Sequence, residues 1–175
     1  TLPPLPALEW EDLGGVARTI VNQSGHPLLV NLFASYCKPC LAELKEMTER
    51  WPALSASGLK VAALSVEKLD PDTAEEGAAA VRALAAREKL PFEVGFLAPQ
   101  AMKRLETLNG GLFNLDRAFP LPTSFLVDGS GRVAMIYKAP VTVEALLAVV
   151  AALRKDRGGR DAALPFPGRW QTPLP

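Results

Sequence analysis

The amino-acid sequence predicts an α/β fold in which helices flank a central mixed β-sheet. Two short apolar runs, LLVNLFA at 28–34 and VAALSV at 61–66, have the composition of strands that are covered on both faces. A helical pattern separates these two runs, and near the end of the chain DGSG joins two strand-like segments, which is a β-hairpin signal. With 175 residues, 49% of them hydrophobic, the chain can bury one core without help from disulfides or metal.

The first half of the chain predicts a βαβ unit. Between residues 38 and 50 apolar side chains recur at helical spacing, and Pro52 is expected to end this helix. The helix stands between the runs at 28–34 and 61–66, and segments of this length form a right-handed crossover. The two runs are therefore expected to be parallel strands of one sheet.

The middle of the chain predicts two more helices and one more strand. Thr73 and Glu76 have the spacing of a capping box, so a helix is expected to run from there to about Lys89. FEVGFL at 92–97 predicts a strand, and a short helix is expected over 99–108. The residues expected to end that helix are Asn109, Gly110 and Gly111.

The last third of the chain predicts the hairpin and a closing helix. TSFLVD at 123–128 and RVAMIYK at 132–138 flank the DGSG turn, so they are expected to pair as antiparallel strands. A helix is expected from Val143 to about residue 153. Its apolar face consists of Leu146, Leu147, Val150 and Leu153.

Proline and glycine at both ends of the chain set the expected domain boundaries. We expect one domain over 8–155, a linker over 1–7, and a proline- and glycine-rich linker or tail over 156–175. RKDRGGR, at the start of that tail, is interpreted as a solvated helix end rather than an RNA-contacting segment. Such ends are typical of a module that belongs to a longer chain.

Charge and hydropathy exclude two classes of partner. Acidic and basic residues balance at 19 each, so the chain has no excess positive charge to attract nucleic acid or an anionic membrane surface. No apolar run approaches the roughly 20 residues that a membrane span requires. Because the sequence starts at Thr1, we expect any signal or anchor to be removed or to lie outside it.

The two cysteines of the chain, Cys37 and Cys40, stand where the first buried strand is expected to turn into a helix. Open α/β sheets place their chemistry at this edge. Ser35 is expected to cap the helix, and Pro39 suits its first turn. The helix start and the charge of Lys38 should stabilise a Cys37 thiolate, with Cys40 more shielded but within reach of it. This arrangement predicts an attacking and a resolving thiol.

Metal binding and a purely structural disulfide are the alternatives for these cysteines. Structural zinc usually takes four ligands, whereas the chain has two cysteines and one histidine, His26. Copper delivery would call for a histidine near the later hairpin, and the sequence has none there. His26, beside Pro27, is interpreted as a solvated turn residue. A disulfide between Cys37 and Cys40 would close too small a loop to stabilise the fold much. The sequence therefore favours a redox pair and no metal.

HPLLVNLFASYCKPCLAEL, followed about eighty residues later by PLPTSFLVDGSGRVAMIY, resembles the thioredoxin superfamily. The similarity is to its TlpA/ResA-like branch of extracytoplasmic thiol:disulfide oxidoreductases, and it spans nearly all of 8–155. It implies a thioredoxin-like fold with an αβ insertion between the βαβ unit and the C-terminal β-hairpin. It also implies a cis-proline packed against the disulfide, matched here by Pro122 rather than Pro120, because Thr123 and the strand follow directly. Backbone around Leu121 would then pair with an extended substrate.

The same resemblance suggests the proton acceptor. Asn31 stands where cytoplasmic thioredoxins have a buried aspartate, and an amide cannot shuttle a proton. Glu43 matches a glutamate that fills this role in the ResA-like branch, three residues after the second cysteine. Partial burial would raise its pKa and let it take the Cys40 proton. The alternative is an exposed helix glutamate. Lys45 replaces the branch's helix proline. Tyr36 stands where the branch usually has a tryptophan and is expected to shield the cysteines, with ordinary packing as the alternative.

The segment 70–119 resembles the insertion of this branch, and we expect partner specificity there. GLFNLDRAFPLPTS departs from the more usual approach to the cis-proline, which contains a glycine. Aromatic side chains could line a groove beside the disulfide, with core packing as the alternative. These side chains are Phe113, Phe119 and Phe125.

These observations predict a thiol:disulfide oxidoreductase that acts on protein thiols and disulfides, in either direction, with a protein electron donor or acceptor. Cys37 attacks, Cys40 resolves, Glu43 accepts the proton, and no cofactor is implied. The charge of Lys38 predicts a reduction potential above the roughly −270 mV of thioredoxin. A monomer and an extracytoplasmic location are expected, the latter from the branch alone. The alternatives are a non-catalytic thioredoxin-fold module of a larger protein and peroxide reduction, whose PxxxTxxC signature is absent.

Overall fold

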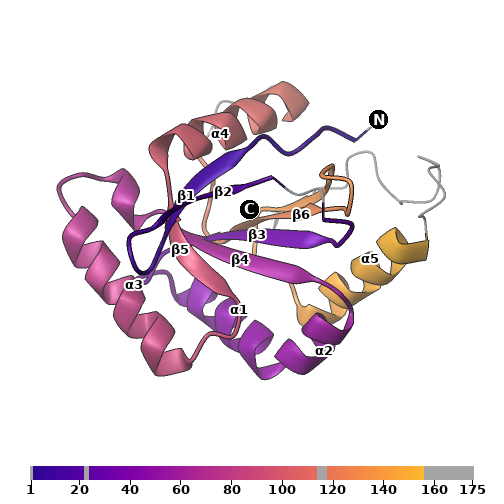
Figure 1. Cartoon of the computed structure of the whole chain (residues 1–175), viewed down its shortest axis with the longest axis horizontal. Coiled ribbons are helices and arrows are strands. Elements are labelled where there is room, and N and C mark those ends of the chain that lie inside the picture. The colour runs from indigo at the N-terminus through magenta and orange to yellow at the C-terminus, as the bar shows by residue number, and fades with distance from the viewer. Residues whose placement is uncertain (1, 22–23, 114–117, 156–175) are drawn as a thin grey trace.

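The computed structural model describes residues 2–21, 24–113 and 118–155, and within them seven strands form one mixed sheet (Figure 1). Its strand order is β2-β1-β5-β4-β3-β6-β7. The strands are β1 (Leu8–Asp12), β2 (Ala17–Ile20), β3 (Leu28–Phe33), β4 (Lys60–Ser65), β5 (Glu93–Leu97), β6 (Thr123–Val127) and β7 (Val133–Tyr137).

The centre of the sheet is the predicted βαβ unit. β3 and β4 are parallel, with Leu28 opposite Lys60 and Phe33 opposite Ser65, and β5 continues the parallel part on the far side of β4. β6 pairs with β3 in the antiparallel sense, as β7 does with β6, which makes the sheet mixed. All six residues of β3 are buried, as its continuous apolar composition predicts. The residues that directly follow β3 in the chain therefore lie at the middle of the sheet.

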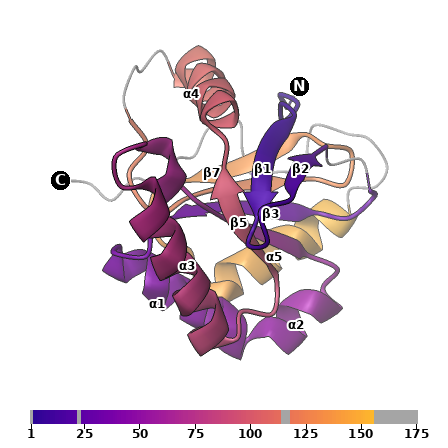
Figure 2. The same ribbon diagram turned by 60° about the vertical axis from the view of Figure 1, so that its left-hand side comes forward.

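Helices cover both faces of the sheet. α4 (Pro99–Phe113) lies on one face, and α1 (Lys38–Glu49), α2 (Trp51–Ala56), α3 (Ala74–Glu88) and α5 (Val143–Lys155) lie on the other (Figures 1 and 2). The odd-numbered residues of β3, such as Leu29 and Phe33, face the α1 side, and the even-numbered ones, such as Val30, face α4. The two cores are therefore separated by the sheet. This arrangement confirms the thioredoxin-like α/β fold.

Three details at the helix ends differ from the predictions. Pro52 does not end the first helix: α1 ends at Glu49, and Pro52 lies in the first turn of α2, where a missing N–H costs no hydrogen bond. Thr73 is the N-cap residue of α3 but its side chain makes no capping hydrogen bond, so there is no capping box. α4 continues through the three residues expected to stop it, Asn109, Gly110 and Gly111.

The hairpin of β1 and β2 was not predicted. It attaches to β5 through antiparallel pairing of β1, with Trp10 opposite Leu97 and Asp12 opposite Gly95. Leu8, at the start of β1, and Trp10 are buried, so this end of the proline-rich N-terminal stretch belongs to the sheet.

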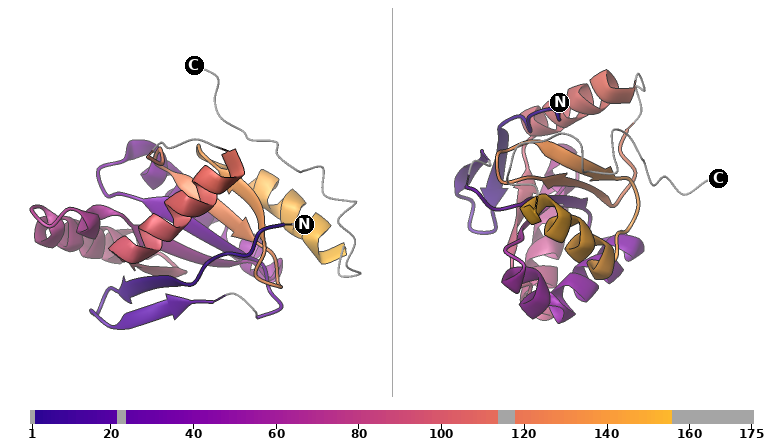
Figure 3. Two further views of the ribbon diagram at one scale, coloured as in Figure 1. Left: turned by 90° about the horizontal axis from the view of Figure 1, so that it is seen from above. Right: turned by 90° about the vertical axis from the view of Figure 1, so that its right-hand side faces the viewer.

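The N-terminal segment before β1 lies beside the β6–β7 hairpin (Figure 3). The Val133 N–H donates to the Pro3 carbonyl at 2.8 Å, and the Leu5 N–H donates to the Gly131 carbonyl at 2.8 Å. The Arg132 guanidinium adds a hydrogen bond to the Leu2 carbonyl at 2.9 Å. Residues 2–5 are therefore tied to the turn of a hairpin that stands more than a hundred residues later in the chain. The predicted linker over 1–7 and tail over 156–175 remain predictions, and the tail lies outside the described residues.

Candidate active site

Cys37 lies at the amino terminus of α1. The chain leaves β3 at Phe33 and makes a tight turn, in which the Cys37 N–H donates to the Ala34 carbonyl at 3.1 Å. Cys37 is the N-cap residue of α1, in extended conformation (φ −88°, ψ 100°), and its Sγ accepts the Cys40 N–H at 3.3 Å. The helix thus points a backbone donor and the positive end of its dipole at this sulfur. The capping role predicted for Ser35 is wrong, because a sulfur fills it.

Cys37 and Cys40 form a disulfide, with their Cα atoms 5.3 Å apart. The two sulfurs differ in access: Cys40 is 0% exposed, whereas Cys37 is partly exposed. Tyr36, Lys38 and Pro39 around Cys37 are exposed, Tyr36 to 74%, so its ring lies largely in solvent. A second protein can therefore approach the disulfide from the side of Cys37.

Glu43 is buried beneath the cysteines, one turn further along α1, with only 3% of its surface exposed. Its Oε1 accepts a hydrogen bond from Asn31 Nδ2 at 2.6 Å, and its Oε2 accepts the Val141 N–H at 2.7 Å. Burial raises the pKa of Glu43 to about 7; the two hydrogen bonds act against this rise, and the charge of Glu46 adds to it. The exposed-glutamate alternative is wrong.

Asn31 and Ser124 connect Glu43 to the sheet. They face each other across β3 and β6, and Asn31 Nδ2 donates to Ser124 Oγ at 2.9 Å as well as to Glu43. Ser124 in turn lies opposite Tyr137 of β7. Among the described side chains, Asn31 Oδ1 and the Tyr137 hydroxyl are buried without a hydrogen-bond partner, and burial raises the pKa of Tyr137 to about 12. Glu43 therefore sits on a short polar row in an otherwise apolar core.

The segment before β6 brings a proline to the same edge of the sheet. β6 runs antiparallel to β3 with Thr123 opposite Leu32, so the preceding Pro122 lies level with the end of β3, where the chain turns toward Cys37. The Leu121–Pro122 peptide bond is cis. Pro122 and Thr123 are buried, Leu121 is half-buried, and Thr123 Oγ1 donates to the Pro120 carbonyl at 2.7 Å.

Glu67 is a residue of this edge that the sequence analysis missed. It opens a short 3₁₀ helix, η1 (Glu67–Leu69), directly after β4, and is 9% exposed. Its carboxylate accepts three hydrogen bonds: from the Ser35 N–H at 2.8 Å, from Ser35 Oγ at 2.5 Å and from Ser65 Oγ at 3.0 Å. An acidic residue just past the carboxyl end of a buried strand was the available signal.

The described residues include the side chains of two of the three phenylalanines of the predicted groove, Phe119 and Phe125. Phe125 is fully buried in the core on the α4 face, so it does not line a groove. Phe119 is half-buried and packs edge-to-face on Phe125, with ring centroids 5.6 Å apart. The Phe113 side chain lies outside the described part of the structure.

The described residues offer no metal site and no membrane span. His26 is exposed and precedes β3, whereas Cys37 follows it, so the strand separates them. In residues 2–21, 24–113 and 118–155, no group of three or more histidine, cysteine, aspartate or glutamate side chains could hold a metal ion. No helix in these ranges is both long enough and apolar enough to cross a bilayer.

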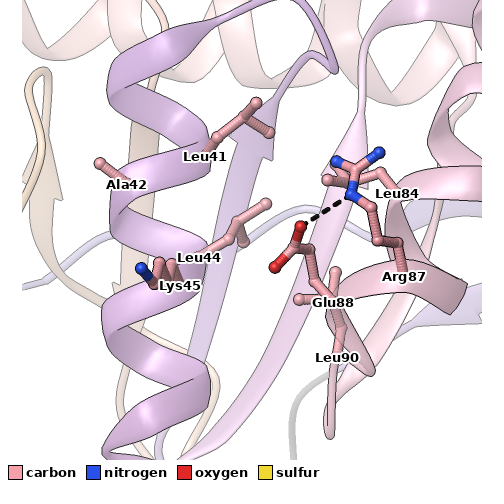
Figure 4. A pocket seen from close by; sticks show the side chains of 8 residues that line it. All are labelled: Leu41, Ala42, Leu44, Lys45, Leu84, Arg87, Glu88 and Leu90. Carbon is pink, nitrogen blue, oxygen red and sulfur yellow. Dashed lines mark hydrogen bonds and ion pairs between the residues drawn. The ribbon is translucent and has the colours of Figure 1, made fainter.

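A pocket of about 190 Å³ lies on the outer side of α1, against the end of α3 (Figure 4). Leucines form its apolar wall, and the ion pair between Arg87 and Glu88 stands at its rim with Lys45 across from it. The pocket contains neither cysteine nor Glu43. The lining leucines are Leu41, Leu44, Leu84 and Leu90.

Comparison with known proteins shows that the chain is similar to one protein family and to several relatives. A model of the AhpC/TSA family matches residues 3–136. The thiol-disulfide oxidoreductase ResA of Bacillus thuringiensis subsp. konkukian (strain 97-27) is 28% identical over 135 residues, which are 77% of this chain and 68% of ResA. ResA of Geobacillus thermodenitrificans (strain NG80-2) is 27% identical over 139 residues, which are 79% of this chain and 70% of that protein.

The fold is shared with solved structures, including the following two. A thioredoxin-family thiol:disulfide interchange protein from Chlorobium tepidum TLS superposes with a TM-score of 0.69 at 20% identity, covering 86% of this chain and 95% of that one. StoA from Bacillus subtilis superposes with a TM-score of 0.57 at 19% identity, covering 82% of this chain and 96% of StoA.

Proposed function

The chain belongs to the AhpC/TSA family and is a thiol:disulfide oxidoreductase, and on this premise we propose that Cys37 attacks, Cys40 resolves and Glu43 accepts the proton. Its substrates are thiols and disulfides of partner proteins. The observation that carries these roles is the position of the Cys37–Cys40 disulfide at the start of α1, with the more accessible sulfur as N-cap and a buried carboxyl one turn away.

In the reducing direction, the first step links the substrate to Cys37 through a mixed disulfide. The Cys37 thiolate attacks a sulfur of the substrate disulfide, the substrate S–S bond breaks, and a mixed disulfide forms with Cys37. The other substrate sulfur leaves as a thiolate and takes a proton from solvent. The N-terminal end of α1 makes this step possible near neutral pH, because it stabilises the attacking anion.

The second step releases the substrate. Cys40 gives its proton to Glu43 and attacks Cys37 Sγ, so that the Cys37–Cys40 bond forms and the mixed disulfide breaks. The second substrate thiolate leaves, and the substrate has gained two electrons that the cysteine pair has lost. A pKa of about 7 suits Glu43 for this transfer, since a base is most useful when its pKa is near the working pH. The oxidising direction reverses both steps.

The edge beside Cys37 fits an extended partner segment. Backbone at Leu121, ahead of the cis-bonded Pro122, is proposed to pair with substrate backbone by strand addition. Exposed Tyr36 and Lys38 would flank that segment. The cysteine pair carries the electrons itself, so no metal or organic cofactor is part of the proposal.

Reduction of insulin by dithiothreitol, followed by turbidity, tests the activity. The wild-type protein should accelerate precipitation, and Cys37→Ser should abolish the acceleration. Ala42→Ser is the control, because it adds a serine at an exposed position of the same helix without removing a sulfur. A folded, fully reduced wild-type protein that is inactive would instead support the non-catalytic module, and consumption of peroxide would support the peroxidase alternative.

Trapping with Cys40→Ser tests the division of roles. This variant should accumulate partners in mixed disulfides on Cys37 that dissolve on addition of dithiothreitol. The reverse variant, Cys37→Ser, should trap none. If Cys37→Ser traps partners instead, Cys40 is the attacking residue and the proposal is wrong.

We further propose that the protein works outside the cytoplasm, as a monomer, and that a second protein supplies or removes its electrons. The location rests on the resemblance to the TlpA/ResA-like branch, and cell fractionation of the source organism tests it. Equilibration with glutathione tests the proposed reduction potential, which should lie above the roughly −270 mV of thioredoxin.

A further inference from the structure

We propose that Glu67 is a positioning residue: its carboxylate holds the turn before Cys37 through Ser35, and the close approach of α3 at Gly77 holds Glu67 in turn. The inference rests on the proposed function, because it treats Cys37 as the attacking group. It assigns a role to a buried acidic side chain that the thiol chemistry itself does not use.

The sheet places Ser35 and Glu67 next to each other. Phe33 and Ser65 are opposite each other at the ends of the parallel strands β3 and β4, so the residues two positions further on leave the sheet side by side. The Val66 N–H donates to the Phe33 carbonyl at 3.0 Å, which continues the ladder past β3. Glu67 therefore reaches the turn at the carboxyl ends of two neighbouring strands.

Both hydrogen-bond donors of Ser35, the backbone N–H and the hydroxyl, bind the Glu67 carboxylate. The four residues Ala34 to Cys37 form a turn closed by the Cys37 N–H and the Ala34 carbonyl, which leaves the Ser35 N–H without a partner inside the turn. Glu67 accepts that N–H at 2.8 Å and the Ser35 hydroxyl at 2.5 Å. Two hydrogen bonds to one carboxylate fix the turn in rotation as well as in position, and so fix where Cys37 enters α1.

α3 fixes the other end of the contact. A Cβ atom at Gly77 would lie 2.7 Å from Glu67 Cβ and 3.3 Å from Glu67 Cγ, so α3 packs on the Glu67 side chain as closely as a hydrogen atom allows. An alanine would favour the helix by about 1 kcal/mol. Glycine at position 77 therefore permits the close contact with Glu67, although it makes the helix itself less stable than alanine would.

The proposal assigns the effect to hydrogen-bond geometry rather than to charge. In Glu67→Gln the amide oxygen can accept from the Ser35 N–H and from Ser65 Oγ, while the amide nitrogen donates to the Ser35 hydroxyl. In Glu67→Ala all three contacts are lost. Glutamine should therefore preserve the turn, and alanine should release it.

The test is the pH profile of alkylation of Cys37 by iodoacetamide in the Cys40→Ser background, where one thiol reacts. Glu67→Ala and Gly77→Ala should move the profile to higher pH and slow the reaction at neutral pH about ten-fold, because a thiol displaced from the helix start loses stabilisation of its anion. Glu67→Gln should stay within about three-fold of the parent. Gly111→Ala is the control, since its Cβ would meet nothing within 4 Å.

Two results would overturn the inference: Glu67→Ala and Gly77→Ala with parental profiles, or Glu67→Gln as impaired as Glu67→Ala. Thermal melting shows whether each variant is folded. If Glu67→Ala is not, Ser35→Ala decides, because it removes the 2.5 Å contact from the other side and should shift the profile in the same direction. Insulin reduction by the two-cysteine protein separates this inference from the proposed function, since an inactive wild type refutes only the latter.

Discussion

At the residue scale, Glu43 combines a nearly complete burial with the capacity to carry a charge, which the proposed role of proton acceptor requires. Hydrogen bonds from Asn31 and Val141 compensate its ionised form, and their effect on the pKa is smaller than that of burial. The site thus has a group that changes its protonation near neutral pH, close to two sulfurs that exchange protons during turnover.

The resolving step should depend on Glu43. In Glu43→Gln the single-turnover release of substrate from the mixed disulfide should slow by about 10²-fold or more at neutral pH, since a positioned base typically contributes that much. Its pH profile should move toward the roughly 8.5 of an unassisted thiol. Rapid-mixing experiments measure this rate, with exposed Glu49→Gln of the same helix as control. Equal profiles for Glu43→Gln and the wild type would exclude Glu43 as the base.

The free energy of unfolding should also depend on pH through the ionisation of Glu43. Its pKa is about 7 in the folded disulfide form against an ordinary value of 4.5, so the folded state retains a proton that the unfolded chain loses. The stabilisation is complete below about pH 4.5 and is lost as the pH rises through about 7, amounting to about 3 kcal/mol. Glu43→Gln lacks this loss, because its amide stays neutral. Urea unfolding of both proteins over this range should show diverging stabilities, and parallel curves would contradict the assignment.

Local spacing explains which site residues the sequence could predict. Cys37, Cys40 and Glu43 belong to one helix start, so their order in the chain already encodes their geometry. Asn31 was singled out through the family resemblance, because cytoplasmic thioredoxins have an aspartate at its position. Its contact with Ser124, like that of Ser35 with Glu67, depends on strand register, which the sequence does not state.

At the scale of elements, the strands with continuous apolar runs were predictable, and the peripheral ones were not. LEWED and ARTI, which form β1 and β2, contain charged residues and pair with each other, and β1 also pairs with β5, far away in the chain. α4 runs past Asn109, which is 2% exposed, and the preceding Leu105 and Leu108 pack in the core beneath the helix. Tertiary packing there outweighs a helix-propensity cost of about 1 kcal/mol for each glycine.

Gly95 of β5 makes the attachment of β1 possible. A Cβ atom there would lie 2.3 Å from the Glu11 carbonyl oxygen and 2.5 Å from the Trp10 ring. Gly95→Ala should therefore push β1 away from β5 and lower the free energy of unfolding by about 1–3 kcal/mol or more. Denaturant unfolding measures the loss, and Gly111→Ala, at an open helix position, should show none. Unchanged stability of Gly95→Ala would mean that the β1–β5 contact is not as close as described.

At the scale of the whole molecule, the candidate active site collects residues from distant parts of the chain onto one edge of the sheet. β3 supplies Asn31 and the turn to Cys37, β4 leads to Glu67, and β6 follows Pro122. The element order and the sheet centre were predictable from apolar runs and the family resemblance, whereas the N-terminal contacts with the β6–β7 hairpin were not.

Those N-terminal contacts yield a prediction for the domain boundary. A chain of residues 8–155 lacks the hydrogen bonds of Pro3 and Leu5 with the hairpin, and should fold but be about 1–3 kcal/mol less stable than residues 1–155. Thermal and urea unfolding of the two chains test this prediction. Both chains end at residue 155, so the tail does not contribute to the difference in stability. Equal stabilities would show that the segment before residue 8 does not contribute to the free energy of unfolding, as expected of a linker.

The position of β2 at the end of the strand order has a consequence for behaviour at high concentration. Within the described part of the chain no strand pairs with its outer side, and such strand edges template intermolecular sheets and aggregation in other proteins. Here the edge is only four residues long, and Arg18 within it is held by Asp12 at 2.8 Å. A short, charged border of this kind discourages a second molecule from pairing with β2.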